Sequence, residues 1–402
     1  MIDFKALSET YGTPLYVYDF DAMRVQFESL KEAFKGRKSI LAYAVKANSN
    51  LSVIKHFAQL GSGADCVSIG EVRRALMVGI PKYRILLSGV GKSDDEIREA
   101  IKADILYINV ESEAELSRVE MIARELNAKA RISIRVNPNI DPKTHPYIST
   151  GLHDNKFGVE IVAAKRMYIQ AKNSNHLDPV GIHFHIGSQL TELEPIYEAA
   201  AIVSDLLRSL QAINIELKFF DIGGGLGVRY NDEITIQPYD YAQAILSALK
   251  GLDITIICEP GRFLTANAGY FLTKVLYEKR NGAKRFVIVD GAMNDLIRPS
   301  LYKAYHRIEA LGKEGDEGPA DVVGPVCESG DFLAKNYPLP AMEHNDLLVV
   351  HSAGAYGFGM GSNYNTRGRS AEIAVDGENI RLIRRRETFE DVIALEREYL
   401  EG

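Results

Sequence analysis

A lysine inside an apolar run is the first residue whose chemistry needs an explanation. Lys46 follows mostly apolar residues in YAVKAN, where an ammonium group costs free energy unless it is paired or deprotonated. A lysine with a lowered pKa is a nucleophile that forms a Schiff base with an aldehyde. The alternative is a lysine whose charged end reaches the surface.

A second ionisable residue ends another apolar stretch. Glu259 follows ITIIC and is costly to ionise without a cationic partner. The ring nitrogen of pyridoxal phosphate is such a partner, because a carboxylate beside it keeps the ring protonated as an electron sink. The aldehyde of the same cofactor would suit Lys46. An ion pair between Glu259 and Arg262 is the structural alternative.

Three consecutive glycines indicate a close approach between backbone and ligand. The stretch DIGGGLG contains Gly223, Gly224 and Gly225, without the glycine spacing of a dinucleotide fold or the lysine of a nucleoside-triphosphate loop. Backbone N–H groups in such a stretch can converge on a phosphate. A tight turn without a ligand is the alternative.

Two histidines give a rival interpretation. His183 and His185 alternate in HFHIGSQ and therefore share one face of a strand. Such a pair could ligate zinc, as in metal-dependent barrel hydrolases. No further His or Asp cluster appears where the first, fourth, fifth and eighth expected strands end. We therefore expect no metal, with one ring stacked on a flat cofactor and the other packed in the core.

Polar residues in the last third could recognise a charged group. Arg298 and Tyr302 are four apart in RPSLY, so on a helical turn they face the same way and could clamp a carboxylate. Cys327 lies beside Glu328 in the polar turn GPVCESGD, where it could donate a proton or simply be an exposed thiol. Tyr356 lies in AGAYGFG, whose small residues would leave its ring exposed unless the loop packs over it.

The elements that must position these residues begin at Ser39. Short β-rich runs alternate with amphipathic helical stretches, the pattern of βαβ units and a parallel sheet. The expected strands are 39–45, 63–67, 84–88, 105–110, 131–136, 179–184, 217–221 and 254–258. The expected helices include 51–60, 70–78, 94–102, 112–127, 160–172, 193–211 and 239–249. Eight alternations predict an α/β fold with a (β/α)8 TIM barrel, and an open doubly wound sheet is the alternative.

In the predicted barrel, the unusual residues would lie together at the carboxyl ends of the strands. In TIM barrels the chemistry lies at the carboxyl ends of the strands. Lys46, Asp65, His185, the glycine stretch and Glu259 all fall at or just beyond expected strand ends. We therefore expect them to share one site.

The rest of the chain differs from the barrel. Beyond about residue 265 the apolar runs lack long helices between them, which predicts a mainly antiparallel β domain. We expect a barrel domain over 24–265 and a β domain over 266–402 that includes the N-terminal segment 1–23. The Pro- and Gly-rich connection at 137–158 is long for a compact domain, and such loops are usually functional.

Composition excludes several classes of protein. The net charge of −7 and the absence of a basic stripe argue against nucleic-acid or membrane partners. No apolar run approaches the roughly 18 residues of a membrane span. The first ten residues do not resemble a secretory signal, and three cysteines are too few for a disulfide framework. Small-molecule chemistry in the cytoplasm is the expectation.

The motifs together resemble a known family. YAVKAN, HPYISTGL, HIGSQ, DIGGGLG, EPGR, RPSLY, GPVCESGD and AGAYGF follow one another nearly end to end, as in the fold-type III pyridoxal-phosphate-dependent amino-acid decarboxylases. Within them, the chain is most similar to the branch acting on meso-2,6-diaminopimelate. The resemblance implies pyridoxal 5'-phosphate as cofactor. It also implies a homodimer whose active sites lie between the barrel of one subunit and the β domain of the other.

The resemblance also implies roles for individual residues. Lys46 would carry the cofactor, His185 would stack on its ring and Glu259 would pair with its nitrogen. The remaining cofactor contacts would come from Asp65, Ser188, Gly223, Gly224, Gly225, Pro260, Gly261, Arg262 and Tyr356. Substrate would be bound by Arg262, Arg298, Tyr302, Glu328 and Tyr356, and Cys327 would return a proton to the α-carbon.

The implied reaction is decarboxylation at the D-centre of meso-2,6-diaminopimelate, giving L-lysine and carbon dioxide. A substrate with a second complete amino-acid group needs cationic and anionic recognition away from the reacting carbon, and this sequence offers both. Related decarboxylases acting on ornithine, arginine or carboxynorspermidine are the nearest alternatives. A racemase and a metal-dependent barrel hydrolase are more distant ones.

Overall fold

The computed structural model describes residues 2–141 and 155–400. The described chain divides into two compact units. One unit contains Arg24–Val228 and Ile234–Phe263, and the other contains Met1–Met23, Arg229–Glu233 and Leu264–Gly402.

The first unit is a closed barrel. Within the described residues, eight parallel strands pair in the order of the sequence, and the last pairs with the first. They are β2 (Ser39–Ala44), β3 (Gly63–Cys66), β4 (Ile85–Leu87), β5 (Tyr107–Val110), β6 (Ala130–Arg135), β7 (Leu177–His183), β8 (Phe219–Asp221) and β9 (Thr255–Cys258). The predicted TIM barrel is therefore confirmed, and the open sheet is excluded because β2 pairs with β9.

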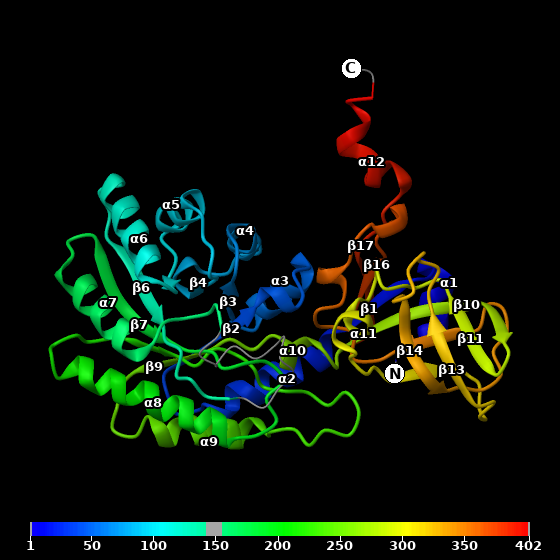
Figure 1. Ribbon diagram of the computed structural model, residues 1–402, viewed down its shortest axis with the longest axis horizontal. Helices are drawn as coiled ribbons and strands as arrows, with labels where there is room; N and C mark the ends of the chain where they lie inside the picture. The colour runs from blue at the N-terminus through cyan, green and yellow to red at the C-terminus, as the bar shows by residue number, and fades with distance from the viewer. Residues whose placement is uncertain (1, 142–154, 401–402) are drawn as a thin grey trace. The chain divides into compact units, whose positions relative to one another are not determined.

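Helices follow the strands and lie outside them, as Figure 1 shows for α6, α7 and α8. The helices are α2 (Phe20–Ala33), α3 (Leu51–Gln59), α4 (Ile69–Met77), α5 (Asp94–Ala103), α6 (Glu113–Glu125), α7 (Ile161–Asn173), α8 (Glu194–Gln211), α9 (Pro238–Ala248) and α10 (Arg262–Thr265). Serine side chains cap three of them, at Ser68, Ser93 and Ser112. Ser93 and Glu96 form a capping box, which fixes where α5 begins.

The second unit is built on a mixed sheet. Its described strands are β1 (Leu15–Asp19), β10 (Gly269–Asn281), β11 (Lys284–Val289), β12 (Ile308–Ala310), β13 (Pro319–Val323), β14 (Phe332–Pro338), β15 (Leu347–Val350), β16 (Ala371–Asp376) and β17 (Asn379–Arg384). The main path runs β14-β13-β11-β10-β1-β16-β17, with β15 between β10 and β12. Most pairs are antiparallel, as predicted, while β1 with β16 and β11 with β13 are parallel.

The N-terminal strand lies in the middle of this sheet, between β10 and β16. Its side chains Leu15 and Val17 pack with Leu272, Val349 and Ile373 in an apolar cluster. The unit also contains the helices α1 (Phe4–Tyr11), α11 (Arg298–Tyr302) and α12 (Phe389–Arg397). Burial of each such aliphatic side chain contributes about 1.5–3 kcal/mol, which anchors the start of the chain in this unit.

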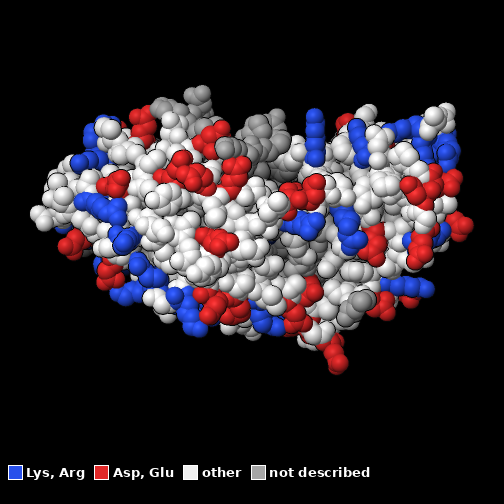
Figure 2. All heavy atoms as spheres, turned by 90° about the horizontal axis from the view of Figure 1, so that it is seen from below, with Lys and Arg blue, Asp and Glu red and all other residues white. Residues whose placement is uncertain are grey.

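The surface carries charges of both signs. Figure 2 shows acidic and basic side chains interspersed over the face in view, in keeping with a modest net charge of −7. Among residues 2–141 and 155–400, no helix combines the length and apolar character needed to cross a membrane.

A buried carboxyl group should make the second unit sensitive to pH. Asp295 accepts hydrogen bonds from the Ser370 hydroxyl and the Ala292 N–H, and burial raises the pKa of Asp295 to about 6. The folded chain therefore holds a proton that the unfolded chain loses near pH 4. Consequently, the contribution of this group to the free energy of unfolding falls as the pH rises from about 4 to 6.

The measurement is the melting temperature of wild type and Asp295→Asn across this pH range. The amide cannot ionise, so the variant is expected to lose less stability between pH 4 and 6 than wild type does. Parallel curves for the two proteins would show that Asp295 does not titrate in this window.

Candidate active site

Lys46 lies immediately beyond β2, in a short 3-10 turn at Val45–Ala47 rather than in the strand itself. Its Nζ atom is 3.0 Å from Oδ2 of Asp65 at the end of β3, because Asp65 pairs in register with Ala44. Asp65 is fully buried, whereas the Lys46 side chain is 38% exposed. Burial and the nearby Glu259 raise the pKa of Asp65, and Lys46 opposes this shift.

Lys46 and Asp65 open onto a cavity of about 450 Å³ at the carboxyl end of the barrel. His185 and Glu259 line the same cavity. Four residues that the sequence placed at the ends of four different strands therefore meet at one cavity. The fold explains this convergence, because all the barrel strands are parallel and end on the same side.

Glu259 pairs with His183. The ion pair with Arg262, which the sequence offered as the alternative, is not the contact that the structure shows for Glu259. Nε2 of His183 lies 3.3 Å from Oε2 of Glu259, and both side chains are buried. Although burial favours the neutral acid, His183 and Lys46 lower the pKa of Glu259 to about 2. The other oxygen, Oε1, is buried and has no hydrogen-bond partner among the described residues. A carboxylate with one oxygen held and the other available suits a cationic ligand.

His185 is only partly buried and lies against the glycine turn. The N–H of Gly224 donates to its Nδ1 over 3.3 Å, which requires Nδ1 to be without a proton. The loss of water around the ring, together with the nearby cations of Arg135 and Lys46, lowers the pKa of His185 well below its usual range. His185 is therefore a neutral, flat ring at neutral pH.

The glycine turn follows β8, and its backbone lies close to neighbouring chain segments. Gly223 and Gly225 have φ values of 66° and 111°, a region that favours glycine. A Cβ atom on Gly224 would clash with the carbonyl oxygen of Glu259, and one on Gly225 would clash with that of Gly187. Side chains are thus excluded sterically, because the segments that follow β7 and β9 pack directly against the turn.

Arg262 and Ser188 meet although they are far apart in the sequence. Nη2 of Arg262 donates to the hydroxyl oxygen of Ser188 over 3.0 Å. Pro260 and Gly261 connect Glu259 to Arg262, and a Cβ atom on Gly261 would lie 3.0 Å from the Cβ of Ala44. The EPGR turn is therefore packed tightly against the segment that carries Lys46.

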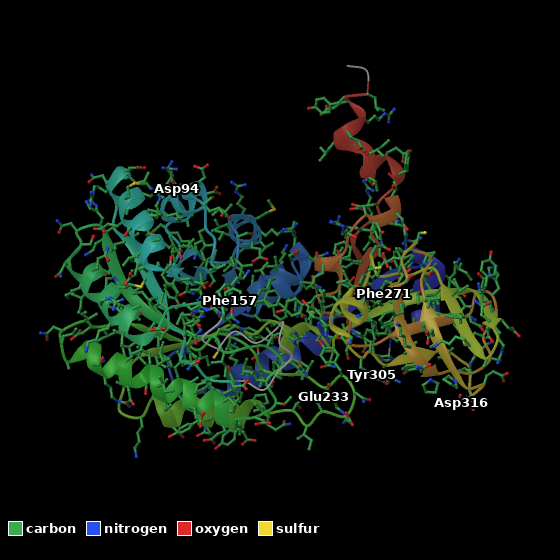
Figure 3. The ribbon with its side chains drawn as sticks, viewed as in Figure 1. Asp94, Phe157, Glu233, Phe271, Tyr305 and Asp316 are labelled. Atoms are coloured by element: carbon green, nitrogen blue, oxygen red, sulfur yellow. The ribbon has the colours of Figure 1, made fainter. Side chains whose placement is uncertain are left out.

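Several residues that line the cavity were not singled out from the sequence, among them Arg135 and Phe157. Arg135 ends β6, forms a buried ion pair with Glu111 at 3.2 Å and lies 4.7 Å from the ring centre of Phe157. Phe157, labelled in Figure 3, also lines the cavity. The signal for Arg135 was available, since like Lys46 it is a cation at the end of an apolar strand. The HPYISTGL motif, at residues 145–152, lies outside the described residues.

The other predicted residues lie in the second unit. Arg298 and Tyr302 occupy the helical turn α11, as their spacing predicted. The Arg298 guanidinium is buried between two rings, 5.0 Å from the centre of Tyr230 and 5.7 Å from that of Tyr302. Tyr230 belongs to a loop held by Glu233, labelled in Figure 3, which accepts from the N–H of Tyr230.

The remaining candidates differ in exposure. Cys327 and Glu328 are exposed, and the N–H of Cys327 donates to the side chain of Asn365. Tyr356 is half-buried rather than exposed as expected, because its loop packs closely: a Cβ atom on the next residue, Gly357, would lie 2.9 Å from the Tyr16 hydroxyl. Tyr356 also has a φ of 54°, a left-handed backbone conformation that is uncommon for an aromatic residue.

The geometry also bears on the rival metal interpretation. Potential ligand atoms of His183, Asp221 and Glu259 lie within 4.8 Å of one another in the described chain. His185, the second member of the histidine pair, does not belong to this group. Both oxygens of Asp221 already accept hydrogen bonds, from the Tyr107 hydroxyl and the Gly223 N–H. His183 and His185 therefore do not belong to one set of potential metal ligands, as the hydrolase interpretation requires.

A barrel with a lysine, a buried carboxylate and a glycine turn at its carboxyl end defines a class of enzyme that binds a phosphate-bearing aldehyde. The family described as pyridoxal-dependent decarboxylase, pyridoxal binding domain, matches residues 20–266. The chain belongs to this family.

Full-length relatives narrow the class further. The diaminopimelate decarboxylase of Campylobacter jejuni is 60% identical over 402 residues, which is all of both chains. The crystal structure of diaminopimelate decarboxylase from Helicobacter pylori complexed with L-lysine is 56% identical, with a TM-score of 0.97 over 99% of this chain and all of that one. The crystal structure of diaminopimelate decarboxylase from m. jannaschii in co-complex with L-lysine is 38% identical, with a TM-score of 0.93 over 97% of this chain and 93% of that one.

Proposed function

We propose that this chain is a pyridoxal-phosphate-dependent carboxy-lyase that decarboxylates meso-2,6-diaminopimelate at its D-centre to L-lysine and carbon dioxide, the last step of lysine biosynthesis. The observation that carries the proposal is the convergence of Lys46, Asp65, His185 and Glu259 on one cavity. Identity of 60% along the whole of a diaminopimelate decarboxylase supports the substrate. So do the relatives crystallised with L-lysine, which is the expected product.

The residues of the cavity fit pyridoxal 5'-phosphate. When bound, this cofactor accepts the electron pair left on the α-carbon as the carboxylate departs. Oε1 of Glu259 has no other partner among the described residues and would accept a hydrogen bond from the ring nitrogen. Lys46 would hold the aldehyde carbon, and the neutral ring of His185 would lie against the flat face of the cofactor.

The phosphate would be held on the other side of Glu259. The turn at Gly223, Gly224 and Gly225 has no room for side chains, and its backbone would lie beside this anion. The Ser188 hydroxyl would add a neutral donor, and Arg262, which already contacts Ser188, would add a cation. Pro260 and Gly261 fix the separation between this end of the site and Glu259.

The second unit would recognise the far end of the substrate. In this proposal Arg298 and Tyr302 bind the distal carboxylate, with Arg262 and Tyr356 as further contacts, and Glu328 binds the distal ammonium. The Cys327 thiol donates its proton to the α-carbon after carbon dioxide has left, and solvent returns a proton to the thiolate. Because Cys327 and Glu328 are exposed, they are accessible to a second copy. We include in the proposal a cytoplasmic homodimer in which each site combines the barrel of one subunit with the β unit of the other.

The test is an assay of the purified protein loaded with pyridoxal phosphate. Carbon dioxide release is measured with meso-, LL- and DD-diaminopimelate, ornithine and arginine, and borohydride is used to trap the cofactor on the chain. We expect activity with the meso compound above all others and a trapped peptide containing Lys46. Faster turnover of ornithine or arginine would favour a related decarboxylase. Tightly bound zinc without a visible cofactor band would favour a metal-dependent hydrolase.

A further inference from the structure

Asp221 is a buried acid that the roles above leave unused. It is the last residue of β8 and is fully buried. Its Oδ1 accepts from the N–H of Gly223 over 2.9 Å, and its Oδ2 accepts from the Tyr107 hydroxyl over 2.8 Å. One side chain therefore fixes the first residue of the glycine turn and is itself fixed from β5.

Asp221 also lies beside the carboxylate of Glu259. The potential ligand atoms of His183, Asp221 and Glu259 are all within 4.8 Å of one another. Two carboxylates buried so close together cannot both ionise without a large cost in free energy, so the pair holds a proton.

The surroundings decide which acid keeps this proton. Glu259 faces the imidazole of His183 and shares its cavity with Lys46, and both stabilise a negative charge. The hydrogen-bond donors to Asp221, a phenol and a backbone amide, are neutral. Burial and the charge on Glu259 raise the pKa of Asp221 well above its usual value. The proton therefore resides on Asp221.

We propose that Asp221 is a positioning residue that remains protonated at neutral pH. Through its contacts with Glu259 and Gly223, it fixes the carboxylate that would meet the ring nitrogen relative to the turn that would meet the phosphate. This inference rests on the proposed function, since it requires the ring nitrogen of pyridoxal phosphate to meet Glu259. A neutral Asp221 leaves a single negative charge facing the single positive charge of the protonated ring. An ionised Asp221 would add a second charge and repel Glu259.

The experiment measures the dissociation constant of pyridoxal phosphate and the pH dependence of its visible absorbance band in wild type, Asp221→Asn and Asp221→Ala. Asparagine keeps an acceptor for the Gly223 N–H and has no charge, so binding is expected within about threefold of wild type, with an unchanged pH profile. Alanine leaves the Gly223 N–H and Tyr107 hydroxyl without this acceptor, so binding is expected to weaken about 10-fold or more.

Two further variants keep the inference falsifiable. Tyr107→Phe removes one hydrogen bond to Asp221 without changing the acid, and it is expected to weaken cofactor binding less than alanine does. Asp253→Asn alters an exposed aspartate of the same unit and should change nothing. If Asp221→Asn binds as weakly as Asp221→Ala, or shifts the pH profile, Asp221 is ionised and the inference fails. It also fails if Asp221→Ala binds like wild type. A wild type that binds no pyridoxal phosphate would instead overturn the proposed function.

Discussion

Replacing Arg298 by alanine is expected to raise the KM for meso-diaminopimelate roughly 10- to 150-fold, the loss of a hydrogen-bonded contact to a charged group. The Arg298 guanidinium is held between the rings of Tyr230 and Tyr302 and donates through Nε to Nε2 of His306 over 3.4 Å. His306 in turn contacts the carbonyl oxygen of His351 through Nδ1 at 3.0 Å. A guanidinium fixed in this way can bind a carboxylate with little further loss of side-chain entropy.

The measurement is steady-state kinetics of wild type, Arg298→Ala and Arg298→Lys, with melting temperature as a check on folding. Lysine keeps the charge but not the planar fork, so an intermediate KM is expected. Lys303→Asn is the matched control, because it removes an exposed cation just beyond the same helical turn. Asparagine also tolerates the φ of 53° found there. An unchanged KM in Arg298→Ala would favour substrates without a distal carboxylate, such as ornithine.

The barrel was predictable because its signal is local and repeated. Each strand is a short apolar run followed by an amphipathic helix, and this alternation needs no knowledge of distant contacts. All eight expected strands are present, with ends displaced by at most two residues; β7, for example, starts at Leu177 instead of 179. The strand ends then place Lys46 and Glu259 at the same end of the barrel.

The contacts within the site were not predictable in the same way. The sequence offers Glu259 and Arg262 as neighbours three residues apart, whereas the structure pairs Glu259 with His183 and Arg262 with Ser188. These partners are 76 and 74 residues away. The register of the strands and the conformation of the turns that follow decide which side chains meet. Neither can be read from a single sequence.

Asp221 shows a second kind of omission. It stands next to the glycine stretch in DIGGGLG, and the glycines alone attracted the phosphate interpretation. A buried acid at the end of an apolar strand was the argument used for Glu259, and it applies equally to Asp221. What sequence could not supply is the contact with Tyr107, 114 residues away across the barrel. That contact is what makes the side chain part of the site.

Replacing Lys46 by methionine is expected to lower kcat by at least about 10³-fold, within the range for loss of a group that takes part directly in the reaction. Borohydride should then no longer link the cofactor to the chain. Lys38→Met is a matched control, since Lys38 is an exposed lysine of the same unit, 3.5 Å from Asp253. Turnover within a few-fold of wild type in Lys46→Met would remove Lys46 from the reaction.

The same change should alter stability in a pH-dependent way, because Lys46 is the cation beside buried Asp65. The pKa of Asp65 is already raised by burial, and without Lys46 it would rise further. A raised carboxyl pKa means that the folded chain binds a proton that the unfolded chain has lost. The free energy of unfolding therefore falls as the pH rises above about 4.

Without cofactor, Lys46→Met should thus match wild type near pH 4 and be less stable near pH 7. The difference is expected to be about 1–2 kcal/mol, less than for a fully buried pair because the Lys46 side chain is 38% exposed. Adding Asp65→Asn should restore the stability at pH 7 but not the activity. Denaturant unfolding at the two pH values measures this, and a double variant as unstable as Lys46→Met would show that the loss does not come from the charge on Asp65.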